Sequence, residues 1–436
     1  MKTDKASILS KDGVSYLIPF VLITSCFALW GFANDITNPM VKAFSKIFRM
    51  SATDGALVQV AFYGGYFAMA FPAAMFIRRY SYKAGVLLGL GMYAFGAFLF
   101  FPAKMTGEYY PFLIAYFILT CGLSFLETSC NPYILSMGTE ETATRRLNLA
   151  QSFNPIGSLA GMYVAMNFIQ ARLHPLDTAD RALLDEQEFE AIKDSDLSVL
   201  IAPYLAIGLV ILLMLILIRL VKMPKNGEEN HNINFVPTLK RIFTQSRYRE
   251  GVIAQFFYVG AQIMCWTFII QYGTHLFMSQ GMEEKAAEIL SQKYNIVAMV
   301  IFCISRFVCT FILRYLNAGR LLMILAVLGG VFTLGAVFLQ NIYGLYSLVA
   351  ISACMSLMFP TIYGIALKGL GEDAKFGAAG LIMAILGGSV LPPLQALVID
   401  MKTVGGFPAV NLSFLLPFIC FIVISWYGYR TVRNRW

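Results

Sequence analysis

The sequence has little charge for its length. Only 13% of its 436 residues are Asp, Glu, Lys or Arg, whereas 58% are apolar and the mean hydropathy is +0.67. A soluble globular domain carries about twice that share of charge. The composition therefore excludes a soluble domain, gives no basis for a nucleic-acid partner, and predicts an integral membrane protein.

Metal ligands are also scarce. The three histidines, His174, His231 and His275, fall in or beside expected loops and form no cluster. All eight cysteines lie inside or at the edge of apolar segments, where a free thiol behaves as a small hydrophobe, and none has metal-ligand spacing. We therefore expect no metal, no disulfide and no organic cofactor. These absences argue against a membrane enzyme.

A cleavable signal pattern is not present either, because the first apolar segment is long and no small-residue cleavage site follows it. About 20 apolar residues are enough to cross the hydrocarbon core as a helix, and twelve such windows occur in the chain. They begin near Ser15, Leu57, Ala84, Tyr110, Leu147, Leu197, Val252, Tyr294, Leu321, Tyr343, Phe376 and Ala409. The predicted fold class is an all-α membrane protein with twelve transmembrane helices.

The distribution of charge predicts the orientation of these helices. With the amino terminus inside, the cytoplasmic segments hold 22 of the 33 Lys and Arg and the outer segments hold 10, whereas 9 acids lie inside and 14 outside. Basic residues are enriched on the cytoplasmic side of membrane proteins. We expect a multi-pass protein of the cell inner membrane with both termini in the cytoplasm. The acidic outer stretch "DTADRALLDEQEFEAIKDSD" is predicted to be a solvated, partly helical surface.

The chain is also expected to contain a repeat. Residues 222–249 form the longest cytoplasmic connection and separate a six-span half, residues 1–221, from a second one, residues 250–436. "FIRRYSYKAGVLLGL" follows the second span of the first half, and "FILRYLNAGRLLMIL" follows the second span of the second half. Parallel six-helix repeats of this kind are the architecture of the major facilitator superfamily.

The connection between the halves contains one apolar pattern. In "FVPTLKRIF", Phe235, Leu239, Ile242 and Phe243 recur at helical spacing. This pattern predicts an interfacial helix on the cytoplasmic side. A solvated linker is the alternative.

Polar residues at membrane depth indicate the candidate site, because a charged or amide side chain is costly against lipid. Spans three, six, nine and twelve carry essentially none, and the polar residues concentrate in the other eight spans. In a facilitator fold those eight helices surround a central cavity. Only two acids, Asp35 and Glu127, lie at membrane depth.

Helical spacing places several of these side chains on common faces. Glu127 and Asn131 are four residues apart, as are Gln262 and Trp266, and Gln151 and Asn154 are three residues apart. Amides donate and accept hydrogen bonds, and aromatic rings pack against the C–H face of a sugar. The cavity is therefore predicted to bind a neutral, polyhydroxylated molecule. The expected substrate-binding residues are Asn38, Asn131, Gln151, Asn154, Gln255, Gln262, Trp266, Arg306 and Tyr363.

Span five also has a structural interpretation. Small residues let helices approach closely and amides bond across helix interfaces. Gln151 and Asn154, with Gly157 and Gly161, are alternatively residues that hold helices together.

The other candidates have structural interpretations as well. Trp266 and Tyr363 fit ordinary packing. Glu127 and Arg306 alternatively form a structural ion pair, although buried pairs stabilise poorly compared with apolar replacements.

Several motifs resemble those of one family. "FLETSCNPYILSMG" followed by "RRLNLAQSFNPIGS", with "AQFFYVGAQIMCWTF" and "RRYSYKAG", is similar to the L-fucose:proton symporter family over most of the chain. The Leu-Glu-Thr-x-x-Asn-Pro and Leu-Asn-Leu-Ala-Gln motifs are more specific than a general facilitator pattern. The resemblance implies proton-driven import of a sugar such as L-fucose, glucose, galactose or N-acetylglucosamine.

The resemblance also implies roles for individual residues. The protonatable glutamate of the family's fourth span matches Glu127, and its span-five Gln and Asn match Gln151 and Asn154. The family's span-one acid belongs to an Asn-Asp pair, which matches the pair that ends at Asp35, whereas an alignment without a gap places it on Asn38. Asp35 and Asn38 are therefore alternatives for that position.

A buried carboxyl group gives a physical basis for proton coupling. In a low-dielectric helix bundle the neutral form is favoured, so the group can take up a proton outside and release it inside. Protonation removes the charge that opposes closure around the site, so a proton gradient can drive alternating access. We expect Glu127, and second Asp35, to couple protons to sugar, with the proton gradient in place of a cofactor.

The expected protein is thus a monomeric secondary transporter in the lipid bilayer that imports a small sugar, with L-fucose first. Symport of glucose, galactose or N-acetylglucosamine is one alternative, and an exporter or a facilitator without proton coupling is another. A non-transporting membrane sugar sensor belongs to a different class. It would need a sizeable cytoplasmic domain, and the longest inner segment is residues 222–249.

Overall fold

The computed structural model describes residues 10–11, 14–37, 40–50, 57–176, 178–223 and 235–434. The chain forms two compact units. The N-unit contains Leu9–Met137 and Phe153–Ile233, and the C-unit contains Gly138–Ser152 and Asn234–Trp436. The short segment before Phe153 therefore belongs to the unit built mainly from the second half of the sequence.

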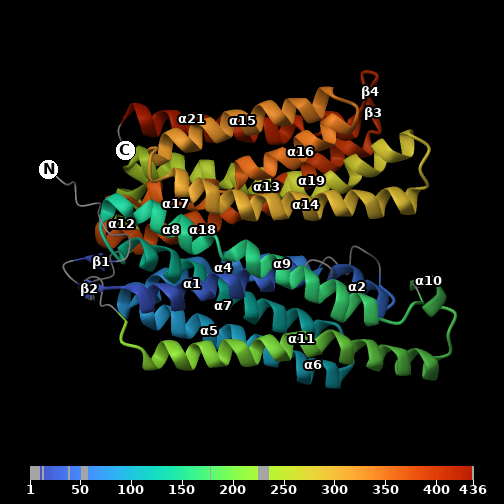
Figure 1. Ribbon diagram of the computed structural model, residues 1–436. Helices are drawn as coiled ribbons and strands as arrows, with labels where there is room; N and C mark the ends of the chain where they lie inside the picture. Colours follow the sequence, from blue (N-terminus) through green and yellow to red (C-terminus); the bar gives the residue numbers. More distant parts are fainter. Residues whose placement is uncertain are drawn as a thin grey trace. The chain divides into compact units, whose positions relative to one another are not determined.

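The N-unit is almost entirely helical (Figure 1). Its helices are α1 (Leu17–Thr37), α2 (Met40–Ile47), α4 (Leu57–Arg79), α5 (Tyr82–Phe98), α6 (Phe100–Thr106), α7 (Tyr110–Ser136), α9 (Asn154–Val164), the π-helix η2 (Ala165–Ile169), the 3-10 helix η3 (Gln170–Arg172), α10 (Thr178–Arg181) and α11 (Glu186–Leu220). Two short strands, β1 (Ser10–Lys11) and β2 (Val14–Ser15), pair antiparallel with Ser10 opposite Ser15.

The C-unit is helical as well (Figure 1). Its helices are η1 (Glu140–Thr142), α8 (Ala143–Gln151), α12 (Phe235–Thr244), α13 (Ser246–Ser279), α14 (Glu284–Ile312), α15 (Ala318–Phe338), α16 (Ile342–Met355), α17 (Met358–Leu367), η4 (Gly371–Asp373), α18 (Ala374–Met383), η5 (Ala384–Leu386), α19 (Gly387–Asp400), α20 (Ala409–Leu412) and α21 (Leu415–Arg433). The strands β3 (Thr403–Val404) and β4 (Phe407–Pro408) pair antiparallel with Thr403 opposite Pro408.

The prediction of twelve spans is confirmed. In the described residues, 11 helical segments are long and apolar enough to cross a membrane. The remaining span is the fifth, where the chain passes through α8, α9, η2 and η3. Each of these pieces is shorter than a membrane-crossing helix, because the α-helical pattern is interrupted after Gln151 and again after Val164. Together they supply the length that a span requires.

Helix contacts within each unit confirm the repeat. In the N-unit α1 packs on α9, α4 on α7, and α5 on α11. In the C-unit α13 packs on α19, α14 on α16, and α15 on α21, which are the corresponding spans of the second half. The pairs α5 with α11 and α15 with α21 are seen side by side in Figure 1. The two halves are therefore built on the same pattern of helix pairs.

The two basic turns of the repeat end in the same kind of helix cap. Ser81 precedes α5 and its hydroxyl accepts a hydrogen bond from the Ala84 N–H at 3.0 Å. Asn317 precedes α15 and its Oδ1 accepts from the Gly319 N–H at 2.9 Å. Both caps satisfy an N–H group that the first helical turn leaves without an intrahelical partner. The local sequence thus sets where the third and ninth spans begin.

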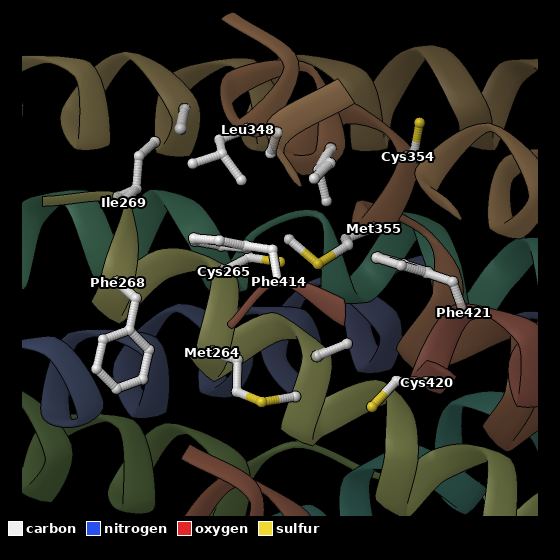
Figure 2. Close-up of a cluster of buried hydrophobic side chains, with 14 of the residues drawn as sticks. Met264, Cys265, Phe268, Ile269, Leu348, Cys354, Met355, Phe414, Cys420 and Phe421 are labelled. Carbon is white, nitrogen blue, oxygen red and sulfur yellow. The ribbon is translucent and has the colours of Figure 1, made fainter. Parts of the chain in front are cut away.

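The core of the C-unit contains apolar side chains of α13 and α16 and of residues 410–427, which include most of α21. Figure 2 shows Met264 and Phe268 of α13 in this cluster with Leu348 and Met355 of α16 and Phe421 of α21. All of these side chains are buried. They hold the helices that carry the polar residues of this unit in fixed positions.

The acidic outer stretch is partly helical and mostly exposed over its described residues, as the sequence predicts, but Arg181 and Asp196 are exceptions. Helix α11 already begins at Glu186, and Arg181 and Asp196 are 0% and 1% exposed. Arg181 Nη2 lies 2.5 Å from Asp196 Oδ2, and the His174 N–H donates to Asp196 Oδ1 at 2.8 Å. The prediction was wrong for these residues because the opposite charges pair and are buried together.

The connection between the halves contains the helix α12, at the position of the apolar pattern. Ile242 is fully buried and Phe243 is exposed. Arg241 forms two hydrogen bonds of 2.8 Å with the carboxylate of Asp373. The Arg241–Asp373 ion pair and the Ile242 side chain thus fix α12 within the C-unit. Residues 224–234, the rest of the connection, lie outside the described residues.

Candidate functional site

Glu127 lies on α7 in the middle of the N-unit and is 5% exposed. The Tyr66 hydroxyl of α4 donates a hydrogen bond to Glu127 Oε1 at 3.0 Å. The same hydroxyl lies 3.5 Å from Asn34 Oδ1 of α1. A buried carboxylate needs such donors, because its charge is costly away from water. Side chains of α1 and α7 thus both contact the Tyr66 hydroxyl of α4.

Asn131 follows Glu127 by one helical turn and is fully buried. Its Nδ2 donates to the Glu127 backbone carbonyl at 2.9 Å. Pro132, next in the chain, has no N–H to donate within α7, so the helix loses one backbone hydrogen bond at this point. The Asn131 side chain thus bonds to the backbone of the residue that carries the buried carboxyl group.

Asp35, the second acid at membrane depth, is half-buried on α1. Asn38, the alternative for the span-one acid, lies outside the described residues.

Asn154 begins α9, and its Nδ2 donates to the Phe27 backbone carbonyl of α1 at 3.1 Å. A Cβ atom added at Gly157 would lie only 1.8 Å from the Ala28 carbonyl oxygen. Only glycine permits this approach of the two helix backbones. Asn154 and Gly157 thus contribute to the contact between α1 and α9.

Arg306 lies on α14 in the C-unit and is 3% exposed. Its Nη1 donates to the Gln151 backbone carbonyl at 2.9 Å, and its Nε donates to the Ser356 carbonyl. The guanidinium carbon lies 4.6 Å from the centre of the Phe302 ring, a distance at which a cation is attracted to an aromatic face. The Arg306 charge is thus held by two carbonyl groups and one ring of its own unit.

Trp266 extends this arrangement along α13. Its ring meets the Phe302 ring edge-on at 4.8 Å between centres, and its Nε1 donates to the Ser352 hydroxyl at 3.2 Å. Gln262, one turn earlier, is half-buried like Trp266. Phe302 therefore separates the indole from the guanidinium and orients both.

Gln255 is the most unusual amide of the C-unit. It is 0% exposed, and neither its Nε2 nor its Oε1 has a hydrogen-bond partner among the described residues. Buried amides normally have partners, because leaving them unpaired costs free energy. Tyr363, also fully buried, stacks on Phe359 with the ring centres 6.2 Å apart. Gln255 therefore has hydrogen-bonding capacity for a bound molecule, whereas Tyr363 packs against a neighbouring ring.

Sequence reasoning missed Tyr66, Phe302 and Ser352. A count of charged and amide residues does not include aromatic hydroxyls, so Tyr63 and Tyr66 did not stand out although they lie three residues apart on one helix. Phe302 and Ser352 are ordinary residue types in apolar spans. Their importance depends only on contacts between helices.

Known proteins resemble the chain over nearly its whole length. The family model described as Major Facilitator Superfamily matches residues 23–393. The L-fucose-proton symporter of Haemophilus influenzae is 52% identical over 98% of this chain and 98% of its own. The L-fucose-proton symporter of Escherichia coli is 34% identical over 94% of this chain and 92% of its own.

The fold comparison agrees with the sequence comparison. A crystal structure of the Escherichia coli fucose:proton symporter matches with a TM-score of 0.86 and 33% identity, over 95% of this chain and 99% of that one. The prediction of a multi-pass transporter of the inner membrane, not an enzyme, is thereby confirmed. The chain belongs to the Major Facilitator Superfamily and, within it, to the family of the L-fucose-proton symporters.

Proposed function

We propose that the protein imports L-fucose together with protons by alternating access. The observation that supports proton coupling is the burial of the Glu127 carboxyl group in a membrane-spanning helix. The Tyr66 hydroxyl donates a hydrogen bond to it. When this carboxyl group is ionised, its charge makes closure of the bundle around it costly, and protonation removes that cost. No cofactor other than the proton gradient is needed.

The choice of sugar has support from the residues and from the relatives. We assign proton coupling to Glu127 and Asp35, and substrate binding to Asn38, Asn131, Gln151, Asn154, Gln255, Gln262, Trp266, Arg306 and Tyr363. The unpaired amide of Gln255 and the half-buried Gln262 and Trp266 favour a neutral polyhydroxylated ligand. The relatives named L-fucose-proton symporters favour L-fucose among such ligands. A 6-deoxy sugar replaces one hydroxyl by a hydrogen, and apolar side chains accept the resulting methyl group readily.

The remaining parts of the proposal concern topology and assembly. With 22 of the 33 Lys and Arg in the segments assigned to the inside, both termini lie in the cytoplasm. The protein acts as a monomer. Its partners are the sugar and the lipid bilayer.

Competition among sugars tests the substrate. In proteoliposomes with the outside acidified, uptake of labelled L-fucose is expected to be suppressed by excess unlabelled L-fucose and much less by glucose, galactose or N-acetylglucosamine. The physical reason is that a site fitted to a 6-deoxy sugar leaves an additional hydroxyl without a partner, which costs binding free energy. If one of the other sugars competes and L-fucose does not, the substrate assignment is wrong and only sugar symport survives.

Replacement of Asp35 tests its role. Asp35→Asn is expected to slow uptake from an acidified exterior by roughly tenfold, because a relay carboxyl that cannot exchange protons delays proton delivery. Exchange of sugar at equal pH should stay near its original rate. The measurement compares both rates per molecule of folded protein. Reduced yield with normal uptake per folded molecule would show that Asp35 is structural.

A further inference from the structure

Tyr66 makes two contacts with one hydroxyl group. The hydroxyl oxygen lies 3.0 Å from Glu127 Oε1 and 3.5 Å from Asn34 Oδ1. A phenol has a single proton, so it can donate one full hydrogen bond at a time. The shorter distance favours the Glu127 carboxyl group as the acceptor. Tyr66 thus stands between the carboxyl group of α7 and the amide of α1.

The position of Tyr66 is fixed by its surroundings. The side chain is 5% exposed, and its backbone carbonyl accepts a hydrogen bond from the Ser124 hydroxyl of α7 at 3.1 Å. The Phe62 ring lies 5.8 Å from the Tyr66 ring, one turn away on the same helix. The ring therefore has little freedom, and the hydroxyl proton is the part that is able to change direction.

We propose that Tyr66 is a positioning residue that transmits the protonation state of Glu127 to the outer half of α1. When the Glu127 carboxyl is ionised, the Tyr66 hydroxyl donates to it. When a proton binds the carboxyl, the hydroxyl turns to Asn34 Oδ1. This inference rests on the proposed role of Glu127 in proton coupling. The transported proton enters and leaves on the carboxyl group only, and the phenol keeps its own proton throughout.

The energetic argument follows from the charge of the acceptor. A hydrogen bond to an ionised carboxylate is stronger than one to a neutral amide, so protonation of Glu127 removes the reason for Tyr66 to face α7. Asn34 directly precedes Asp35 on α1. A change of acceptor therefore exchanges a link between α4 and α7 for a link between α4 and α1.

Other ionisable groups surround this pair in the described part of the N-unit. The groups that interact with Tyr66, Glu127 or their immediate neighbours are Asp35 and Cys26 of α1, Tyr63 of α4, Tyr93 of α5 and Cys130 of α7. Of these, only Asp35 is a carboxylic acid. The carboxyl group that the Tyr66 hydroxyl contacts is that of Glu127.

The pH dependence of L-fucose uptake tests the proposal. Tyr66→Phe removes the donor to the ionised carboxylate, so uptake should persist to higher external pH, with the half-maximal point displaced by about one unit. Asn34→Ala removes only the second acceptor, so its half-maximal point should move in the opposite direction. These opposite displacements are the signature of one hydroxyl that serves two acceptors.

Two controls separate this effect from damage to the fold. Tyr93→Phe deletes another buried hydroxyl of the N-unit, which donates to the Leu29 carbonyl at 3.1 Å, and should leave the pH profile unchanged. Combined with Glu127→Gln, Tyr66→Phe should have no effect on the pH dependence of sugar exchange. If Tyr66→Phe does not fold, the proposal is tested by the direction in which Asn34→Ala displaces the half-maximal pH of uptake.

These measurements distinguish failure of the proposed role of Tyr66 from failure of proton coupling at Glu127. An unchanged pH profile in Tyr66→Phe, an equal displacement in Tyr93→Phe, or displacement of Asn34→Ala to higher pH would overturn the role of Tyr66. If Glu127→Gln alone still accumulates sugar, the proton-coupling function itself fails. Loss of accumulation in Glu127→Gln together with an unchanged profile in Tyr66→Phe leaves that function intact and removes only the inference.

Discussion

Glu127→Gln is expected to abolish accumulation of sugar against a gradient while exchange of sugar continues. The glutamine amide has nearly the shape of a protonated carboxyl group and cannot release a proton, so the carrier stays permanently in its neutral, closable form. Transport then follows the sugar gradient alone. In proteoliposomes with an inward proton gradient, the internal concentration should rise only to the external one, whereas counterflow of labelled sugar should proceed at a rate near the original.

The matched control is Glu288→Gln, the same chemical change on an exposed residue of α14. This variant should accumulate sugar as the unaltered protein does. If Glu127→Gln also concentrates sugar, the proton is carried elsewhere. If it loses exchange together with accumulation, Glu127 serves binding or folding and not coupling.

Asp196→Asn is expected to destabilise the N-unit by roughly 3–5 kcal/mol, because it leaves the buried Arg181 guanidinium without a counter-charge. Few other groups offset the charge of Arg181, since its Nη1 lacks a hydrogen-bond partner among the described residues. Its Nε and Nη2 bond to the Leu176 and His174 carbonyls at 3.1 and 3.3 Å. The measurement is the free energy of unfolding from denaturant titrations of the protein in detergent micelles.

An exposed ion pair on the same helix provides the control for this prediction. Lys193 Nζ lies 2.8 Å from Glu190 Oε1, and the Glu190 side chain is 52% exposed. Because solvent screens such a pair, Glu190→Gln should cost less than about 1 kcal/mol. Replacing both buried partners, Arg181→Leu with Asp196→Leu, should restore most of the lost stability. An equal loss of unfolding free energy in Glu190→Gln and Asp196→Asn would contradict the predicted difference between the exposed and the buried ion pair.

The spans and the buried carboxyl group of Glu127 were predictable because their signals are local. A run of apolar residues is sufficient to place a membrane helix. Glu127 stands out in such a run whatever it contacts, because a carboxyl group there is costly. The repeat was also readable, since Ser81 and Asn317 end equivalent turns of the two halves.

The contacts of the candidate site were not predictable, because they depend on how helices are rotated against one another. The sequence places Gln151 and Asn154 three residues apart and predicts a shared face. In the structure α8 ends at Gln151 and α9 begins at Asn154, and the two residues belong to different compact units. Arg181 and Asp196 were missed for a related reason, since only tertiary contact pairs charges that the sequence separates by 15 residues.

The membership of α8 in the C-unit has a consequence for how the halves depend on each other. Asn148 Nδ2 donates to the Thr361 hydroxyl at 3.1 Å, and the Gln151 carbonyl accepts from Arg306. In a fragment made only of residues 235–434, the buried Arg306 would lack its hydrogen bond to the Gln151 carbonyl. The surface of α17 that α8 covers would be exposed. The second repeat is therefore not an autonomous folding module. It is completed by a helix of the first repeat of the same chain.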